Sequence, residues 1–169
     1  MSVTVVDTNV VLVANGQHQD ISPECVKNCA LILASVMKNG RLALDDGFLI
    51  LLEYQNKTQP KNGNRPGDAF VKWALNNRCN AKWVDQVSLL EHDERVFESF
   101  PDDAELANFD APDRKFVAVS GAHPDKPHIA QAADSKWLDW APALQRNGIE
   151  VDFLCKADIQ RFHENKFGA

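Results

Sequence analysis

The chain opens with Val3-Thr4-Val5-Val6-Asp7-Thr8-Asn9-Val10, in which a run of mostly β-branched residues ends at a carboxylate. A short apolar run of this composition predicts a buried β-strand over residues 3–6. Asp7 follows the strand directly and precedes a second apolar run, Val10 to Val13. Such an aspartate serves either as the N-cap of a helix or as an acid at a strand end, and both interpretations stay open.

Strand and helix patterns alternate along the rest of the chain. We expect further strands at residues 41–44, 128–132 and 149–154, and a strand or an extended link at 82–87. We expect helices at residues 23–39, 48–54, 69–76, 112–121, 137–145 and 157–162, and one near 93–99. This alternation predicts an α/β fold, a single domain over residues 1–169 with an open, mostly parallel sheet of about four to five strands and helices on both faces.

Residues 55–109 are the hardest part of the chain to assign. Residues 55–68 are polar and contain two prolines, two glycines and three basic residues, Lys57, Lys61 and Arg65. This composition predicts a mobile basic loop.

The bulk composition is that of a globular chain of 169 residues, 44% hydrophobic, with a formal net charge of −6. No apolar run approaches the roughly 18 residues of a membrane span, and the start lacks a basic leader, so we expect a cytoplasmic protein that does not enter a membrane. The negative charge counts against nucleic-acid binding unless several acids are clustered around a bound cation. The four cysteines, which include Cys25 and Cys29, lack Cys-x-x-Cys spacing and are expected to be small buried side chains of a reducing compartment.

Four acids are candidates for chemistry. Glu53 lies in an apolar helix, where an unpaired carboxylate is unfavourable and calls for a cation, a salt bridge or an edge position. Asp113 follows Pro112 in the first turn of a helix, and Asp134 follows the strand at 128–132. Each of these aspartates also suits a helix start. Together with Asp7, however, they predict a site for a divalent ion with oxygen ligands, Mg²⁺ or Mn²⁺, to which Asp139 is an optional further ligand.

The same residues resemble the PIN-domain nuclease family, to which the VapC-like ribonucleases belong. Val5 to Val10 is similar to the opening strand of the family with its Asp-Thr-Asn, and Glu53 to its second acid. Asp113 to Val119 resembles the third acid and its helix, and His128 to Trp137 resembles the strand that ends at the fourth. The chain departs from the family at Ala132, where a Thr or Ser is usual, and over residues 55–109, a family-variable insertion or helical region that is longer than in compact members.

The resemblance implies a metal-dependent endoribonuclease that hydrolyses phosphodiester bonds, and a possible role as a toxin or defence effector. The implied catalytic metal ligands are Asp7, Glu53, Asp113 and Asp134, with Thr8 and Asn9 in support. Basic residues near these acids are expected to contact RNA phosphates, namely Lys57, Lys61, Arg65, Arg114, Lys115 and Lys136. The implied partners are an RNA substrate, an antitoxin or other regulatory protein, and a second copy of the chain.

Three alternatives remain. One is a non-catalytic PIN-like module that binds RNA or protein, and another is a structure-specific DNA nuclease. A phosphatase of the haloacid-dehalogenase type is disfavoured, because that chemistry needs a second aspartate where this chain has Asn9.

Overall fold

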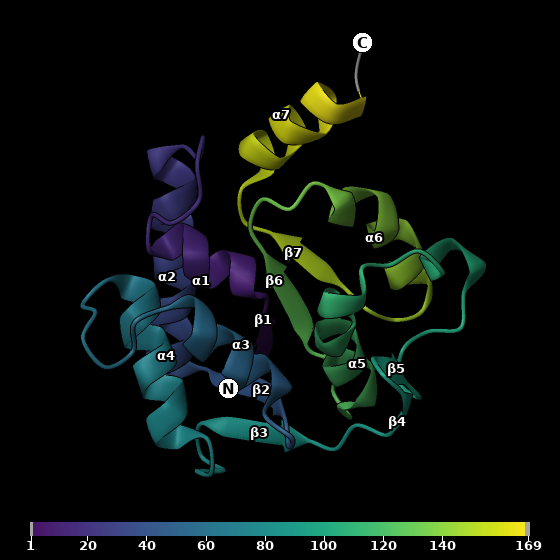
Figure 1. Cartoon of the computed structure of the whole chain (residues 1–169), viewed down its shortest axis with the longest axis horizontal. Coiled ribbons are helices and arrows are strands. Elements are labelled where there is room, and N and C mark those ends of the chain that lie inside the picture. Colours follow the sequence, from purple (N-terminus) through teal and green to yellow (C-terminus); the bar gives the residue numbers. More distant parts are fainter. Residues whose placement is uncertain (1, 168–169) are drawn as a thin grey trace.

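The centre of the molecule is an open sheet of five strands, which the computed structural model describes within residues 2–167 (Figure 1). All strand pairings in this sheet are parallel, and the spatial order is β3-β2-β1-β6-β7. The strands are β1 (Val3–Val6), β2 (Arg41–Asp45), β3 (Val84–Val87), β6 (His128–Gln131) and β7 (Val151–Phe153). The predicted α/β class and the predicted parallel sheet are confirmed.

Both faces of the sheet are covered. Successive side chains of a strand point to opposite faces, and the neighbours Val5 and Val6 in β1 are both fully buried. The same is true of Leu42 and Ala43 in β2. Strands that are buried on both faces need apolar residues at every position, which explains why residues 3–6 show no polar alternation.

Within the described residues, seven α-helices surround the sheet. They are α1 (Thr8–Ala14), α2 (Pro23–Asn39), α3 (Leu49–Lys57), α4 (Pro66–Asn77), α5 (Arg114–Ala122), α6 (Lys136–Arg146) and α7 (Lys156–Phe167). Helices α1, α2 and α4 pack on one another, whereas α5 packs against β1, β2 and β6, on the other side of the sheet (Figure 1). No helix within residues 2–167 is long and apolar enough to cross a membrane.

The segment between β3 and α5 differs from the prediction. In place of the helix expected near 93–99, β4 (Glu91–Asp93) and β5 (Val96–Phe97) form an antiparallel hairpin, with Arg95 at a positive φ of 59° in its turn. Two 3₁₀ turns follow, η1 (Ala104–Leu106) and η2 (Ala111–Asp113). Pro112 therefore opens a 3₁₀ turn, and the α-helix begins at Arg114.

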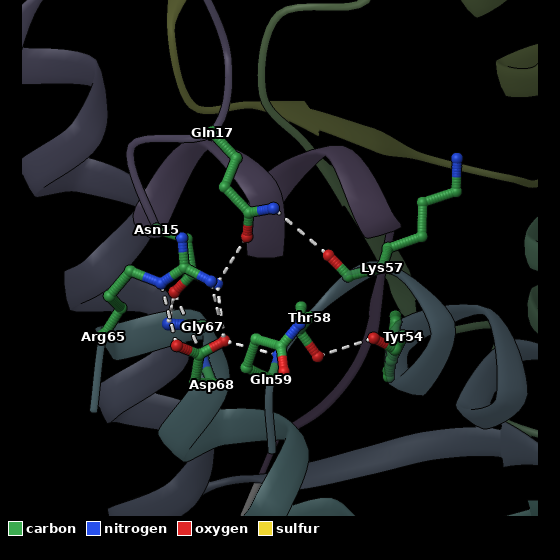
Figure 2. Close-up of polar contacts among 9 residues, drawn as sticks. All are labelled: Asn15, Gln17, Tyr54, Lys57, Thr58, Gln59, Arg65, Gly67 and Asp68. Atoms are coloured by element: carbon green, nitrogen blue, oxygen red, sulfur yellow. Dashed lines mark hydrogen bonds and ion pairs between the residues drawn. The ribbon is translucent and has the colours of Figure 1, made fainter. Parts of the chain in front are cut away.

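The loop predicted to be mobile is anchored at both ends (Figure 2). Asp68, fully buried in α4, accepts hydrogen bonds from Asn15 Nδ2 at 3.0 Å, Gln59 N at 2.9 Å and Arg65 Nε at 2.8 Å. Burial acts to raise the pKa of Asp68, but these hydrogen bonds outweigh it and lower the pKa. The loop is also shorter than expected, because α3 extends through Lys57 and α4 begins at Pro66.

The prediction that all four cysteines are small, buried and unbridged side chains is wrong. Cys25 in α2 and Cys155 at the start of α7 form a disulfide across 130 residues. Cys29 is buried, with its Sγ 3.9 Å from that of Cys155, and burial raises its pKa to about 12. Cys79 is exposed. Local spacing gave no signal for a pairing between residues this far apart in the chain.

Candidate active site

The order of the strands defines one special edge of the sheet. The chain builds β1, β2 and β3 outward in one direction and then returns to place β6 on the other side of β1. In open α/β sheets, ligands bind at the carboxyl ends of the strands on either side of such a reversal. Asp7 follows β1 directly, and Asp134 follows β6 after two alanines. Two of the four predicted acids therefore lie at the edge where a ligand site is expected.

Asp7 is an N-cap that keeps one oxygen without a partner. Its Oδ1 accepts the backbone N–H of Asn9 at 2.8 Å, at the start of α1. Its Oδ2 is buried and has no hydrogen-bond partner, in a residue that is only 4% exposed. Both sequence interpretations of Asp7 therefore apply, since one oxygen caps the helix and the other faces the site.

The pKa of Asp7 shows which groups surround that oxygen. Burial is the main cause that raises this pKa well above its ordinary value, and the charge of Asp113 is the next. The charges of Asp134 and Glu53 raise it further, against the lowering effect of the Asn9 N–H. The other three predicted acids thus each lie close enough to Asp7 for their charges to raise its pKa.

Asp113 ends η2 and lies beside the same cluster. The pKa of Asp113 is raised to about 6, chiefly by burial and by the charge of Asp134, with smaller contributions from Glu53 and Asp110, and against a lowering effect of Lys115. Asp110 is an acid that sequence reasoning missed. Its signal in the sequence was its position three residues before Asp113, at the start of the turn that carries the third acid.

Glu53 differs from the three aspartates because both of its oxygens are engaged. Oε1 accepts the Thr8 hydroxyl at 2.5 Å, and Oε2 lies 2.6 Å from Lys115 Nζ. The expected fully buried helix is not observed, since Leu49 and Leu52 of α3 are 42% and 54% exposed and the Glu53 side chain is 24% exposed. The salt bridge that the sequence left open as an explanation for Glu53 is the one that the structure shows.

Thr8 and Asn9 connect the elements that carry the acids. Thr8 bonds Glu53, as described, and the Asn9 side-chain oxygen accepts the backbone N–H of Ala133 at 2.8 Å. Asn9 thereby links the start of α1 to the segment that carries Asp134. Both residues join segments that carry the predicted acids, and Asn9 also donates its backbone N–H to Asp7.

The basic residues beside the acids are largely paired. Lys115, expected to face RNA, is buried against Glu53 instead. Lys136 Nζ lies 2.9 Å from Asp110, and its hydrogen bond to that carboxylate raises the pKa of Lys136. Arg114 donates from Nε to the carbonyl of Phe109 at 3.3 Å.

The three basic residues of the anchored loop are arranged differently from one another. Arg65 is held by Asp68, and Figure 2 shows its guanidinium turned into that network. Lys57 and Lys61 are exposed, and the Lys57 amine extends away from the network in the same view. Asp139, the optional ligand, is exposed in α6 and lies 2.9 Å from His163, and it is not among the charges that shift Asp7 or Asp113.

A cavity of about 420 Å³ opens beside Glu53, whereas Asp7, Asp113 and Asp134 do not line it. Its lining includes Glu53, Lys57 and Lys115 together with Arg95 from the β4–β5 hairpin. Arg95 was missed in the sequence because the hairpin that presents it was expected to be a helix. Glu91 and Glu94 also line the cavity, so its basic and acidic side chains are equal in number, and Lys57 and Arg95 are the basic groups there that could contact a phosphate.

The residues fit a hard divalent ion by chemistry, but their side chains are not gathered around one point. Within residues 2–167, three metal-ligand atoms lie within 4.8 Å of one another only at Cys25, Cys29 and Cys155. Carboxylates repel one another, and a divalent ion would draw them inward, whereas thiols do not suit Mg²⁺ or Mn²⁺. The partnerless buried oxygen of Asp7 is the feature that favours a cation among the carboxylates.

Comparison with protein-family models, with curated proteins and with solved structures finds no match to this chain.

Proposed function

We propose that the protein is a Mg²⁺- or Mn²⁺-dependent nuclease that cleaves RNA at the acid cluster of Asp7, Glu53, Asp113 and Asp134. One observation carries this proposal. Asp7 holds a buried oxygen that has no partner, among three further carboxylates at the reversal point of the sheet. Such an arrangement is unfavourable in itself, because burial and repulsion both oppose the charge, and a bound cation would relieve both.

The chemistry implied for these residues is phosphodiester hydrolysis. A divalent ion bound there would supply an activated water and would stabilise the charge that develops on the phosphate. Asp7, Asp113 and Asp134 offer the oxygens to hold such an ion, and Glu53 is fixed beside them by Thr8 and Lys115. No covalent nucleophile is needed from the protein.

The proposed substrate is RNA, as the resemblance implies, with its backbone beside the cavity that Lys57 and Arg95 line. We place the protein in the cytoplasm, where this substrate is found. The Cys25–Cys155 disulfide counts against this placement, because cytosolic disulfides are rare. The resemblance also implies an antitoxin or other regulatory partner and a homodimer. Exposed Leu49 and Leu52, next to Glu53 on α3, are the apolar surface that such a partner would cover.

A binding module without catalysis is the second candidate, and the Glu53–Lys115 ion pair favours it. This pair satisfies one acid of the cluster without a metal. Asp7, Asp113 and Asp134 have no ion-pair partner among the described residues, so the pair does not account for the whole cluster.

The deciding experiment is a cleavage panel with single-stranded RNA, structured RNA and DNA flaps, with Mn²⁺, with Mg²⁺ and with a chelator. Cleavage of RNA is expected only with metal. Asp7→Asn is expected to reduce the rate by at least about a hundredfold, the scale on which one charge-stabilising group acts. Asp152→Asn serves as the matched control, because Asp152 is exposed on β7 and pairs with His128.

The outcomes separate the candidates. Retained cleavage in Asp7→Asn would overturn the site assignment. RNA binding without cleavage under every metal condition would establish the binding module, and cleavage confined to DNA flaps would correct the substrate.

A further inference from the structure

Lys115 carries a positive charge at a position in the chain where a cation is unfavourable. The residue is in the first turn of α5, where the helix dipole disfavours a cation. Its side chain is 11% exposed, and burying an ammonium is unfavourable unless it is paired. Nζ pairs with Glu53 Oε2 at 2.6 Å, donates to the carbonyl of Pro112, and lies 4.9 Å from the centre of the Phe116 ring. The acid cluster thus outweighs the local preference and holds a positive charge inside it.

The oxygens of the cluster divide into two groups. Glu53 has no oxygen left without a partner, since Thr8 and Lys115 take one each. On the other side, Asp7 Oδ2 is partnerless and buried. The carboxylate of Asp113 receives no hydrogen bond or ion pair from any residue within 2–167, and Asp134 accepts only the backbone N–H of Lys136, at 3.2 Å through Oδ1. Among these four acids, the oxygens without a protein partner therefore all belong to aspartates, and of these oxygens only Asp7 Oδ2 is buried.

The charges of the cluster support the same division. With all four carboxylates ionised, as a bound cation would favour, they and the one ammonium leave three negative charges. One divalent ion would reduce this to one negative charge, whereas two divalent ions would leave the cluster positive. A carboxylate cluster that already contains a cation needs fewer added ions.

We infer that the ammonium of Lys115 permanently neutralises Glu53 by pairing with it, so that the site binds a single divalent ion, held by Asp7, Asp113 and Asp134. This inference rests on the proposed function and deepens it. Lys115 is a positioning residue that fixes Glu53 and fills the second cation position. Glu53 is then a member of the cluster but not a ligand of the ion.

The test is the number of Mn²⁺ ions bound by the full chain, measured by titration calorimetry and by the spin-resonance signal of free Mn²⁺. The unaltered protein is expected to bind one ion. Lys115→Met is expected to bind a second ion, because it releases Glu53 as a ligand, and the double change Lys115→Met with Glu53→Gln is expected to return the number to one. Lys72→Met, which removes an exposed lysine of α4, is the matched control and is expected to leave the number at one.

Glu53→Gln alone keeps the inference testable if Lys115→Met fails to fold. Its amide can still accept the Thr8 hydroxyl, and one ion is expected to bind with little change in affinity. Three results would each overturn the inference while leaving the proposed nuclease activity intact. These are two ions bound by the unaltered protein, one ion bound with unchanged affinity by folded Lys115→Met, and a loss of Mn²⁺ affinity of more than about tenfold, about 1.4 kcal/mol, in Glu53→Gln. No Mn²⁺ bound by any variant would overturn the proposed function and the inference together.

Discussion

Replacement of Asp7 by asparagine is expected to abolish cleavage and at the same time to make the metal-free protein more stable. Asparagine is as good an N-cap as aspartate, so its carbonyl oxygen can keep the 2.8 Å bond from the Asn9 N–H. The side chain loses its charge, and its amide group offers a donor where Oδ2 now lies without a partner. That donor would face carboxylates whose charges repel Asp7 in the unaltered chain.

The expected increase in the free energy of unfolding follows from the loss of the buried charge and from the new amide donor. A buried acceptor without a partner costs about 1–3 kcal/mol, and the like charges of the neighbouring acids add to this penalty. We take about 2 kcal/mol as the net increase in the free energy of unfolding, which corresponds to a rise of about 4–8 °C in Tm for a chain of this size.

Asp45→Asn is the matched control. Asp45 ends the neighbouring strand β2, is 1% exposed, and also caps a helix, but both of its oxygens are engaged, by Leu49 N at 2.7 Å and Ile50 N at 3.0 Å. The same substitution there removes an acceptor and sets an amide donor against a backbone N–H. It is expected to lower the free energy of unfolding by about 1–3 kcal/mol.

Urea denaturation near neutral pH in the presence of a chelator measures both changes. The two variants are expected to move in opposite directions from the unaltered protein. If Asp7→Asn loses stability as Asp45→Asn does, Asp7 is an ordinary helix cap and the argument for a cation site is refuted.

Three further predictions concern the rest of the molecule. The pKa of Asp113 is raised to about 6 in the folded chain, so its stabilising contribution is present below the unfolded value near 3.8 and is lost as pH rises through 6. In the presence of a chelator, the free energy of unfolding is therefore expected to fall by about 1–3 kcal/mol over this pH range. Added Mn²⁺ is expected to stabilise the protein most above pH 6, and thermal melts across pH would detect both effects. Asp68→Ala is expected to lower the free energy of unfolding by about 3 kcal/mol in urea denaturation, because it leaves the buried partners of Asp68 unpaired, and an unchanged midpoint would contradict this. Opening the Cys25–Cys155 bond with a reductant is expected to lower the free energy of unfolding by about 2–5 kcal/mol. Alkylation of the native oxidised protein, followed by mass spectrometry, is expected to label Cys79 alone. Labelling of Cys25 before reduction would count against the bond.

The fold was accessible from the sequence because its signals are local. The apolar run before Asp7 acts within a few residues, and the structure shows the expected strand over Val3–Val6. The helix expected at residues 23–39 is also observed, with Ser22 as its N-cap. The hairpin at residues 91–97 was missed because its strands are only three and two residues long. Strands this short carry no periodicity from which to predict them.

The site was accessible only in part, because its acids carry local signals and their partners do not. The aspartates stand at a strand end and at helix starts, which sequence patterns identify. The pairing of Lys115 with Glu53 spans 62 positions, and nothing near either residue indicates it. For the same reason Lys115 was expected to face RNA, and Arg65 was expected to be free rather than held by Asp68. Such contacts depend on how the elements dock, which local patterns do not encode.

The acids of the cluster come from segments that range from residue 7 to residue 134, on α3, η2 and two strand ends. The cluster therefore forms only after the central strands have paired across long separations, a late and slow step in folding. An unfolded chain offers the ion at most isolated carboxylates, so an ion that binds the cluster would select the native state almost exclusively. Cellular levels of the metal would then set how much of the protein survives as well as how fast it works.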